Sequence, residues 1–361
     1  VEAAYLARLL DDPRPLYGLV GLPGGFVLLD RIGVDTLAAR LTGDAPWGAA
    51  DLRARLHLKA SAAKQAAQAD LRRFARDRSG TRRLARMLER HLPTGTVWLN
   101  VGHSNLQDPV FDAVHAQAGR TVVLVHDTIP LDWPRFQRPG TVESFAARMR
   151  VVSAQADLVI CNSEATCRDV GRHFTRFGRV PELVVAPLGV TPPRPDPAAL
   201  PAGVDFVRPR FVTLGTIEPR KNHALLLDVW EHFARTLPEA DIPALDIVGA
   251  RGWASETVFD RLDRSPLRGR HLFEHGALAD GAAAALLQGA RALLLPSLAS
   301  GFGLPPAEAL ALGTAVIATD LPVYREFLGN NPVYLDGSDM YSWANQILSF
   351  SRGQAGTHTA A

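Results

Sequence analysis

The sequence predicts an α/β protein of two Rossmann-like, doubly wound domains, each a parallel sheet with helices on both faces. Its 361 residues exceed the usual size of one domain. Short apolar runs alternate with helical patterns along residues 96–186 and again along 211–350, as in successive βαβ units. A proline-rich stretch separates the two regions and is predicted to link them.

The second region carries the clearer pattern. Its predicted strands are the short apolar runs at 211–214, 244–248, 271–273, 292–295, 315–318 and 333–335. Its predicted helices lie near 222–236, 256–264, 280–289, 304–312, 321–328 and 338–350. In the first region, strands are predicted at 97–100, 122–125, 158–161 and 183–185, with helices near 108–118, 141–155 and 164–175.

Domain boundaries follow from these elements. Residues 1–186 are predicted to form the N-terminal domain, with a basic helical insertion at 51–90. Residues 187–210 contain seven prolines and no sustained apolar period, which predicts a linker, and residues 351–361 are predicted to be a flexible tail. Open α/β sheets bind ligands beyond the C-terminal ends of their strands, so domains 1–186 and 211–350 are predicted to face a central cleft.

Composition excludes several classes of protein. A hydrophobic content of 47% and a charged content of 21% are ordinary for a folded globular chain. The formal net charge of +2 argues against a dedicated nucleic-acid binder. The two cysteines, Cys161 and Cys167, support neither a zinc cluster nor a disulfide framework and indicate a reducing cytoplasm. No apolar run is long enough for a transmembrane helix, and because the sequence opens at Val1 without a signal pattern, a missing natural start is expected.

Charge is concentrated in residues 51–90. Ten arginines and two lysines oppose four acids there, a net charge of +8. One interpretation is a solvated helical face, and the other is a face that meets anionic lipid or a phosphorylated acceptor. The second would place the protein at the inner face of the membrane.

Two groups of residues are candidates for a ligand-binding or catalytic site. The first follows the strand at 211–214. Gly215 to His223 read GTIEPRKNH, and Asn222 is predicted to cap the next helix, with Arg220 and Lys221 just ahead of its positive end. That arrangement suits a diphosphate. Lys221 is one of only three lysines in a chain rich in arginine, which indicates that this position requires a compact ammonium group. The alternative interpretation is that Arg220 and Lys221 are two surface cations ahead of a helix.

The second group of residues follows the strand at 292–295. Residues 296–310 read PSLASGFGLPPAEAL, where glycines allow backbone amides to approach a ligand and prolines suit a helix start. Glu308 is predicted in the first turn of that helix, where its carboxylate would receive ribose hydroxyls or complement the helix dipole.

Several segments together carry a family resemblance. GTIEPRKN, PSLASGFGLPPAEA and LGTAVIATDLPVYRE resemble the nucleotide-sugar domain of family 4 glycosyltransferases (glycosyl transferases group 1), retaining enzymes of the GT-B fold. HDTIPLDWP at 126–134 and VICNSEAT at 159–166 resemble the N-terminal domain of that family, especially its bacterial polysaccharide mannosyltransferases. The resemblance covers residues 96–350 and implies transfer from a nucleoside diphosphate sugar, with GDP-mannose expected, to a polysaccharide or lipid-linked glycan.

The resemblance also implies residue roles. Arg220 and Lys221 would hold the donor diphosphate, Glu308 the nucleotide ribose, and His126 would lie near the transferred sugar unless it is merely a structural histidine at a strand end. The remaining implied donor contacts are Gly215, Thr216, Gly276, Ala277, Leu278, Ser300, Gly301, Phe302, Gly303 and Leu304, with the nucleobase near 276–278.

Acceptor contacts are expected on the N-terminal domain. The candidates are His103, Asn105 and Asp127, with a turn histidine bonded to the backbone as the alternative for His103. The family's mechanism needs no metal or other cofactor, and the sequence holds no Asp-x-Asp pair.

Two positions depart from the family pattern. Ser300 stands where a glutamate is usual, and Thr216 where many members carry arginine. A serine offers one hydrogen bond without charge, so a catalytically impaired nucleotide-sugar-binding subunit is an alternative function. An epimerase or phosphorylase of the same fold is a weaker one, because the GFGLPP loop and Glu308 favour transfer.

Overall fold

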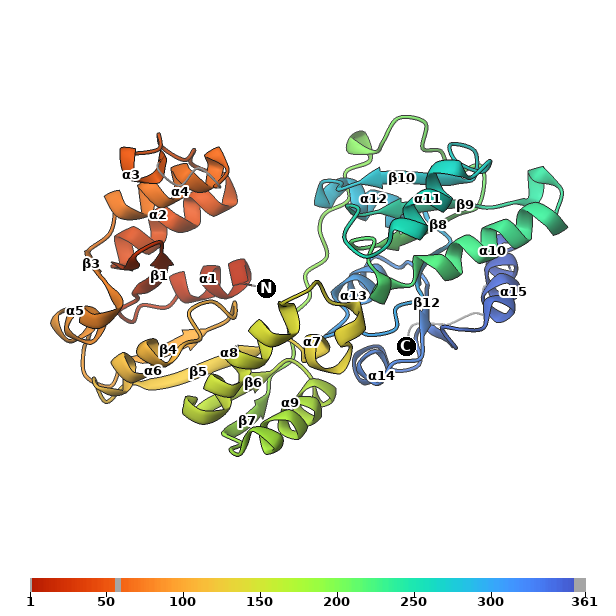
Figure 1. Ribbon diagram of the computed structural model, residues 1–361. Coiled ribbons are helices and arrows are strands. Elements are labelled where there is room, and N and C mark those ends of the chain that lie inside the picture. The colour runs from red at the N-terminus through yellow and green to blue at the C-terminus, as the bar shows by residue number, and fades with distance from the viewer. Residues whose placement is uncertain (1, 56–59, 354–361) are drawn as a thin grey trace. The chain divides into compact units, whose positions relative to one another are not determined.

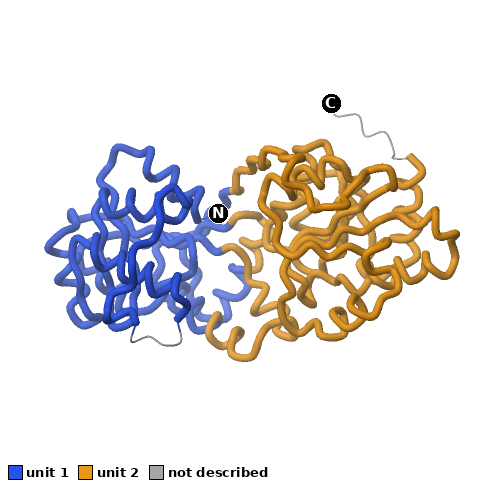
Figure 2. Tube along the Cα trace, turned by 90° about the horizontal axis from the view of Figure 1, so that it is seen from above, with its two compact units in different colours: residues 1–125, 146–161, 170–186 blue, residues 126–145, 162–169, 187–361 orange. Residues whose placement is uncertain are grey.

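The computed structural model describes residues 2–55 and 60–353. The chain divides into two compact units, coloured separately in Figure 2. Unit 1 comprises Val1–Val125, Ala146–Cys161 and Val170–Ala186, and unit 2 comprises His126–Phe145, Asn162–Asp169 and Pro187–Ala361. The last boundary coincides with the start of the expected linker, whereas two segments expected in the N-terminal domain group with unit 2.

Unit 1 contains a four-stranded parallel sheet. Its strands follow one another in the order β4 (Val97–Asn100), β5 (Arg120–Val125), β6 (Leu158–Cys161) and β7 (Glu182–Val185). Helix α6 (Asp108–His115) joins the first two strands, and α8 (Thr141–Gln155) and α9 (Glu164–Phe177) follow β5 and β6. The sequence predicts all four strands because each contains a short apolar run, although only β5 and β6 are largely buried.

A second, antiparallel sheet in unit 1 was not predicted. It consists of β1 (Gly18–Leu22), β2 (Gly25–Leu29) and β3 (Asp77–Ser79), in that order. The hairpin between β1 and β2 turns at Pro23-Gly24, where the positive φ of Gly24 at +88° suits a type II turn. The segment at 51–90, expected to be a basic helical insertion, contains the helices Leu52–Arg55, Ala62–Arg73 and Leu84–His91 in its described part but also the strand Asp77–Ser79, which pairs with β2.

Helices surround this small sheet. They are α1 (Glu2–Leu10), α2 (Arg31–Thr42), α3 (Leu52–Arg55), α4 (Ala62–Arg73) and α5 (Leu84–His91). Phe26 and Leu28 pack in one buried cluster with α5, while Val27 and Leu29 pack in another with Val34 and Leu71. β2 is therefore buried on both faces.

Unit 2 contains a six-stranded parallel sheet. Its strand order is β10 (Leu272–Gly276), β9 (Ala244–Val248), β8 (Arg210–Leu214), β11 (Ala292–Leu295), β12 (Val316–Thr319) and β13 (Val333–Leu335). The helices are α7 (Ile129–Asp132), α10 (His223–Thr236), α11 (Glu256–Arg264), α12 (Asp280–Gly289), α13 (Leu304–Ala311), α14 (Pro322–Leu328) and α15 (Met340–Ser351). Separate apolar clusters cover its two faces, one built around Trp230 and Trp343 and the other around Leu286 and Tyr324, so the doubly wound prediction is confirmed.

Strand order places the site in this sheet. The chain moves outward from β8 through β9 to β10, then returns to the other side of β8 with β11. In open α/β sheets ligands bind at such a reversal, beyond the carboxyl ends of the strands. Both predicted groups of residues follow the two strands that meet there, β8 and β11.

The buried carboxylate of Asp246 connects side chains of three neighbouring strands. Asp246 on β9 is fully buried and accepts hydrogen bonds from Arg210 Nε at 2.8 Å and Arg210 Nη2 at 2.6 Å. His275 Nε2 on β10 lies 2.7 Å from the same carboxylate, and the Arg210 guanidinium lies 4.8 Å from the centre of the Phe273 ring. β8, β9 and β10 are thus joined by side chains as well as by their backbone ladder.

The proline-rich segment and the end of the chain complete unit 2. The short helix η3 (Pro197–Ala199) lies beside α12, where the Asp196 amide donates to the Gly281 carbonyl at 2.9 Å. The expected flexible tail falls largely on residues 354–361, outside the described part of the chain. Within residues 2–55 and 60–353, no helix combines the length and apolar character needed to cross a membrane.

Candidate functional site

Two glycines shape the loop after β8. Gly215 has a φ of +128°, and a Cβ atom at this position would lie 3.2 Å from Lys221 Cε. A Cβ atom at Gly249, after β9, would come within 2.1 Å of the Gly215 carbonyl oxygen. The absence of side chains therefore lets the loops after β8 and β9 cross closely and leaves the Lys221 stem lying over Gly215.

Arg220 joins the loop after β8 to the loop after β11 through hydrogen bonds. Its Nη1 donates to the Ala299 carbonyl at 2.9 Å, its Nη2 pairs with the buried carboxylate of Glu218, and its own carbonyl accepts from the Leu298 amide at 2.8 Å. Glu218 is 5% exposed. Arg220 is therefore built into the site, which disfavours the interpretation of two surface cations.

Lys221 differs from Arg220 because its ammonium has no direct partner among the described residues. Among the described residues its Nζ forms no hydrogen bond or ion pair. Burial, helped by the neighbouring Arg220 charge and opposed by Glu218, lowers the pKa of Lys221 to about 8. A partly desolvated ammonium that lacks a partner favours an anionic ligand.

Asn222 and His223 follow at the start of α10. Asn222 is the N-cap residue of α10, as predicted, but it adopts the left-handed conformation with φ of 55°. Its side chain makes no capping hydrogen bond to the described residues of the helix, because Nδ2 donates to the Gly337 carbonyl at 2.9 Å. His223 is 3% exposed, and neither ring nitrogen has a partner among the described residues. Burial and the Lys221 charge lower the pKa of His223 to about 4, which keeps the imidazole neutral at neutral pH.

The loop after β11 approaches Asp127. A Cβ atom at Gly301 would lie 2.8 Å from Asp127 Oδ2, so only glycine allows this approach without a shift. Thr166 Oγ1 donates to the Gly301 carbonyl at 3.3 Å, and the Ile129 amide donates to Asp127 Oδ1 at 3.0 Å. Burial raises the pKa of Asp127, opposed by its bond from Ile129 and by the Arg220 charge.

Asp127 therefore lies in unit 2 beside the predicted donor loop, although the sequence made it an acceptor candidate. Its neighbour His126 follows β5, and the His126 carbonyl accepts from Asn162 Nδ2 at 2.9 Å. The other acceptor candidates, His103 and Asn105, belong to unit 1. His103 Nε2 lies 3.0 Å from the Leu124 carbonyl and its φ is 54°, which favours the turn histidine interpretation.

Tyr324 on α14 packs against the loop that follows β11. Its side chain is 1% exposed, and a Cβ atom at Gly303, where φ is +111°, would lie 2.9 Å from Tyr324 Cε1. Burial raises the pKa of Tyr324, while its hydrogen bond with the Ser300 side chain opposes that shift. Phe302 is buried against Phe327, with ring centres 4.0 Å apart. Sequence reasoning missed Tyr324 and Glu218, although both lie within the motifs that it singled out.

Glu308 is the fifth residue of α13, one position beyond the first turn that the sequence predicts. Burial, and secondarily the Asp280 carboxylate, raises the pKa of Glu308. Within the described residues the Glu308 carboxylate has no hydrogen bond or ion pair, so it is available to hydroxyl groups of a ligand.

The predicted nucleobase segment follows β10 in the same sheet. Gly276 has a φ of +64°, Ala277 is exposed and Leu278 is half-buried. The sheet therefore brings the ends of β8, β10 and β11, with Lys221, Ser300 and Glu308, to its carboxyl edge. In residues 2–55 and 60–353, no three His, Cys, Asp or Glu side chains cluster closely enough to hold a metal ion.

Comparison with protein families identifies the second half of the chain. Residues 206–358 match the family described as Glycosyl transferases group 1. The chain is 30% identical over 239 residues to the serotype-specific mannosyltransferase WbdA of Escherichia coli, an alignment that covers 63% of this chain and 29% of WbdA. It is 45% identical over 63 residues to the O-antigen chain mannosyltransferase RfbU of Salmonella typhimurium, which is 18% of each chain. The chain thus spans about 29% of the length of the WbdA relatives that it matches.

Solved structures show the same architecture at low sequence identity. TarM is similar with a TM-score of 0.57 at 15% identity, covering 79% of this chain and 54% of TarM. Anabaena Alr3699/HepE, solved in complex with UDP and glucose, is similar with a TM-score of 0.56 at 16% identity, covering 74% of this chain and 71% of HepE. These similarities confirm the predicted fold.

Proposed function

We propose that this chain transfers a sugar from a nucleoside diphosphate donor to a glycan acceptor, because residues 206–358 match the Glycosyl transferases group 1 family and the chain shares the GT-B fold with TarM. The single observation that best supports the proposal is the half-buried ammonium of Lys221 at the reversal point of the sheet, which has no ion-pair partner among the described residues. The acceptor is a polysaccharide or lipid-linked glycan. GDP-mannose is the proposed donor, supported by relatives named as mannosyltransferases.

The proposed chemistry is electrostatic. The bond between the anomeric carbon and the diphosphate breaks, and an acceptor hydroxyl forms the new bond on the same face, so that configuration is retained. The departing phosphate oxygen takes the hydroxyl proton. Lys221 and Arg220 stabilise the diphosphate charge as it develops, which is effective because both cations are already in place. Glu308 accepts hydrogen bonds from the ribose hydroxyls, His126 lies near the sugar, and neither a metal nor another cofactor is part of the proposal.

A donor panel tests this function. Nucleotide release is measured without acceptor from UDP-, GDP- and dTDP-sugars, with transfer to a glycan measured separately. GDP-mannose is expected to be turned over fastest. A much faster reaction with another nucleotide sugar would contradict the proposed donor, and absence of both release and transfer for every donor would contradict the function.

Ser300 supports the alternative of a binding subunit with little turnover. Its hydroxyl bonds to Tyr324 and supplies no negative charge. We expect Ser300→Glu to raise donor turnover about tenfold or more, because a charged hydrogen bond contributes roughly 1.5–3 kcal/mol and the Tyr324 hydroxyl can hold the new carboxylate. The conservative control is Ser300→Thr, which adds no charge.

The two functions then separate. Turnover in the unmodified protein that rises with Ser300→Glu supports the transferase, whereas tight nucleotide binding with turnover only in Ser300→Glu supports the binding subunit.

The basic segment at 51–90 suggests a second binding partner, an anionic lipid surface. Arg53, Arg55, Arg82, Arg83 and Arg86 are exposed in unit 1, whereas Arg72 is neutralised by Asp51 at 2.5 Å. We propose that residues 51–90 contact anionic lipid. Sedimentation with vesicles is expected to increase with the anionic fraction and to decrease with salt. Sedimentation that responds to neither would contradict it. Lys59 lies outside the described residues.

A further inference from the structure

One segment of unit 2 passes along the edge of the sheet where the proposed donor site lies. It is formed by residues 126–138, which follow β5 and include α7 and the short helix η2 (Pro134–Phe136). We call residues 126–138 the strap. The strap contacts the loops that follow two strands of the sheet, β11 and β9.

The first contact lies at the start of the strap. A Cβ atom at Gly301, in the loop after β11, would lie 3.1 Å from the His126 carbonyl oxygen and 2.8 Å from Asp127 Oδ2. A glycine at position 301 therefore lets the strap approach this loop closely. The Asn162 side chain donates to the His126 carbonyl at 2.9 Å, so this end of the strap is fixed from two sides.

The second contact is made by Trp253, in the loop after β9. Its indole Nε1 donates to the Phe136 carbonyl at 2.8 Å, and the Arg138 guanidinium lies 4.7 Å from the centre of the Trp253 ring. A cation over an aromatic face is attracted to that face. One half-buried side chain thus holds the far end of the strap by two different interactions.

The end of the strap that Trp253 holds is ordered by its own side chains. The Trp133 and Phe136 rings are stacked, with centres 5.4 Å apart and planes inclined by 8°. The Arg135 guanidinium lies 5.3 Å from the first ring centre and 4.8 Å from the second. Because these rings and the cation stabilise one conformation, a hydrogen bond to the Phe136 carbonyl positions all of residues 133–138.

The loop after β8 determines where Trp253 lies. A Cβ atom at Gly252 would lie 2.6 Å from Thr216 Cγ2, and the Gly252 amide donates to the Ile217 carbonyl at 3.0 Å. After Trp253 the chain turns at Ala254, whose φ of 49° is uncommon for a residue with a side chain. A backbone in such a conformation persists where the surrounding contacts require it, which indicates that the direction of the Trp253 side chain matters.

Strand order shows which part of the site the strap passes. β8 lies between β9 and β11 in the sheet, so a segment attached to the loops after β9 and β11 passes the end of β8. The loop after β8 carries Thr216, Arg220 and Lys221. The Arg220 charge also reaches Asp127, since it opposes the rise in the pKa of Asp127 that burial causes. The strap therefore lies beside the loop proposed to hold the donor diphosphate.

We propose that Trp253 is a positioning residue, which holds the strap against the donor site and so keeps water from the anomeric carbon before the acceptor binds. The proposal deepens the proposed function and rests on it. The reaction that the strap limits is donor hydrolysis. In that reaction a water oxygen bonds to the anomeric carbon, the bond to the diphosphate breaks, and one water proton passes to the departing phosphate oxygen. Closing a site over its substrate limits such side reactions because it expels water.

Trp253→Phe tests the role of the indole, because it keeps an aromatic face for Arg138 and removes the N–H donor. Donor hydrolysis without acceptor is expected to rise about twofold to tenfold, the effect of losing one ordinary hydrogen bond, while the kcat for transfer to a glycan falls. Loss of stability alone would lower both rates, so opposite changes identify the positioning role. Arg138→Ala, which leaves the hydrogen bond in place, is expected to shift both rates in the same directions by a smaller factor.

Trypsin reports on the strap without any activity measurement. Arg135 is exposed, and the peptide bond after it lies beside the carbonyl that Trp253 holds. Cleavage at this bond, identified by the masses of the two fragments, is expected to be about twofold to tenfold faster in Trp253→Phe. If no variant turns over a donor, the proposed function fails, and the cleavage rate still shows whether Trp253 holds the strap.

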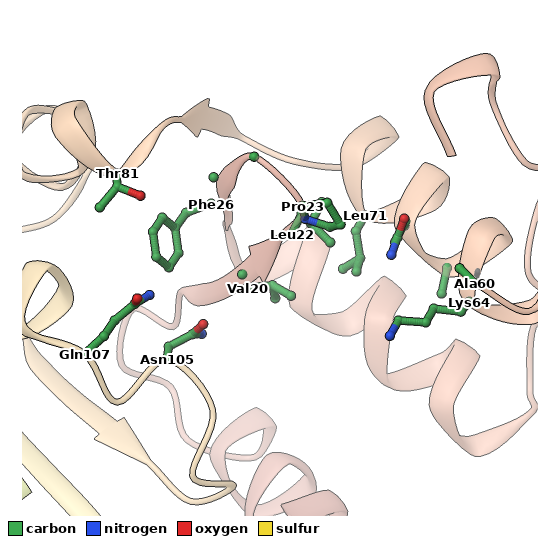
Figure 3. A pocket seen from close by; sticks show the side chains of 15 residues that line it. Val20, Leu22, Pro23, Phe26, Ala60, Lys64, Leu71, Thr81, Asn105 and Gln107 are labelled. Carbon is green, nitrogen blue, oxygen red and sulfur yellow. The ribbon is translucent and has the colours of Figure 1, made fainter. Parts of the chain in front are cut away.

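Two controls lie in unit 1. Trp47 is a half-buried tryptophan with the Arg40 guanidinium 6.0 Å from its ring centre, but its Nε1 makes no hydrogen bond among the described residues. Trp47→Phe is therefore the matched substitution. Gln107→Ala removes an exposed side chain from the wall of a cavity of about 1190 Å³, which lies between the β1–β2 hairpin and α4 (Figure 3). Neither control is expected to change donor hydrolysis or cleavage after Arg135.

The proposal is overturned if Trp253→Phe leaves donor hydrolysis unchanged, or lowers hydrolysis and transfer together. It is also overturned if trypsin cleaves after Arg135 equally fast in the unmodified protein and in Trp253→Phe, or if Trp47→Phe produces the same changes as Trp253→Phe.

Discussion

Replacing Lys221 with alanine is expected to lower donor turnover about 100-fold to 1,000-fold, the usual effect of removing one preorganised group that stabilises developing negative charge. The Lys221 side chain is half-buried beside Gly215, and its ammonium has no partner among the described residues, so its charge is available to the diphosphate. The melting temperature is expected to hold or rise, since burial of this charge disfavours the folded state. Nucleotide release and a thermal melt on the same preparation measure both effects.

The pH dependence follows from the same residue. In the free enzyme the pKa of Lys221 is lowered to about 8, so the ammonium is present below pH 8 and is lost above it. The kcat/KM for the donor is therefore expected to fall as the pH rises through about 8, because a neutral amine cannot stabilise the leaving diphosphate. Lys221→Arg, whose guanidinium stays charged, is expected to lose this alkaline limb.

The control for Lys221 is Arg235→Ala, which removes an exposed cation from the far end of α10. It is expected to leave donor turnover unchanged. Equal losses in Arg235→Ala and Lys221→Ala, or no loss in Lys221→Ala, would refute the assigned role.

Replacing Asp246 with alanine is expected to lower the free energy of unfolding by about 3–5 kcal/mol, as when one partner of a buried ion pair is removed. The substitution would leave Arg210, which is 4% exposed, without its carboxylate, and would remove the partner of His275 Nε2. Urea denaturation monitored by circular dichroism measures the loss.

A matched control lies on the exposed side of the same unit. Asp263 pairs with Arg251 at 2.6 Å, but the Asp263 side chain is 43% exposed. Asp263→Ala is expected to lower the free energy of unfolding far less than Asp246→Ala, because solvent screens exposed pairs. A loss of similar size for both substitutions would show that Asp246 does not act through its burial.

The sheet of unit 2 was predictable because parallel strands covered on both faces are continuous apolar runs, as in Ala244–Val248 and Ala292–Leu295. β10 was predicted to end at residue 273, yet it continues to Gly276. The sequence did not predict this extension because Glu274 and His275 are polar and interrupt the apolar run. Their side chains are accommodated in the strand by hydrogen bonds with Arg251 and Asp246, which the sequence alone does not reveal.

Long-range pairing explains what the sequence could not predict. β3 reads Asp-Arg-Ser, without β-branched or aromatic residues, and becomes a strand only because β2 offers an edge. Glycine loops after strands indicated Gly215 and Gly301, but nothing local to Asp127 indicates that it lies against Gly301.

Each unit is built from segments that are separated along the sequence. The chain passes between the units five times, after Val125, Phe145, Cys161, Asp169 and Ala186. The Glu326 carboxylate accepts amide hydrogen bonds from Glu164 at 2.7 Å and Ala165 at 3.0 Å, and the Phe136 carbonyl accepts from Trp253 Nε1 at 2.8 Å. A gene fragment beginning at Pro187 would keep the buried residues of both apolar clusters but would lack Ala165, which packs against one of them, and the hydrogen bonds given above.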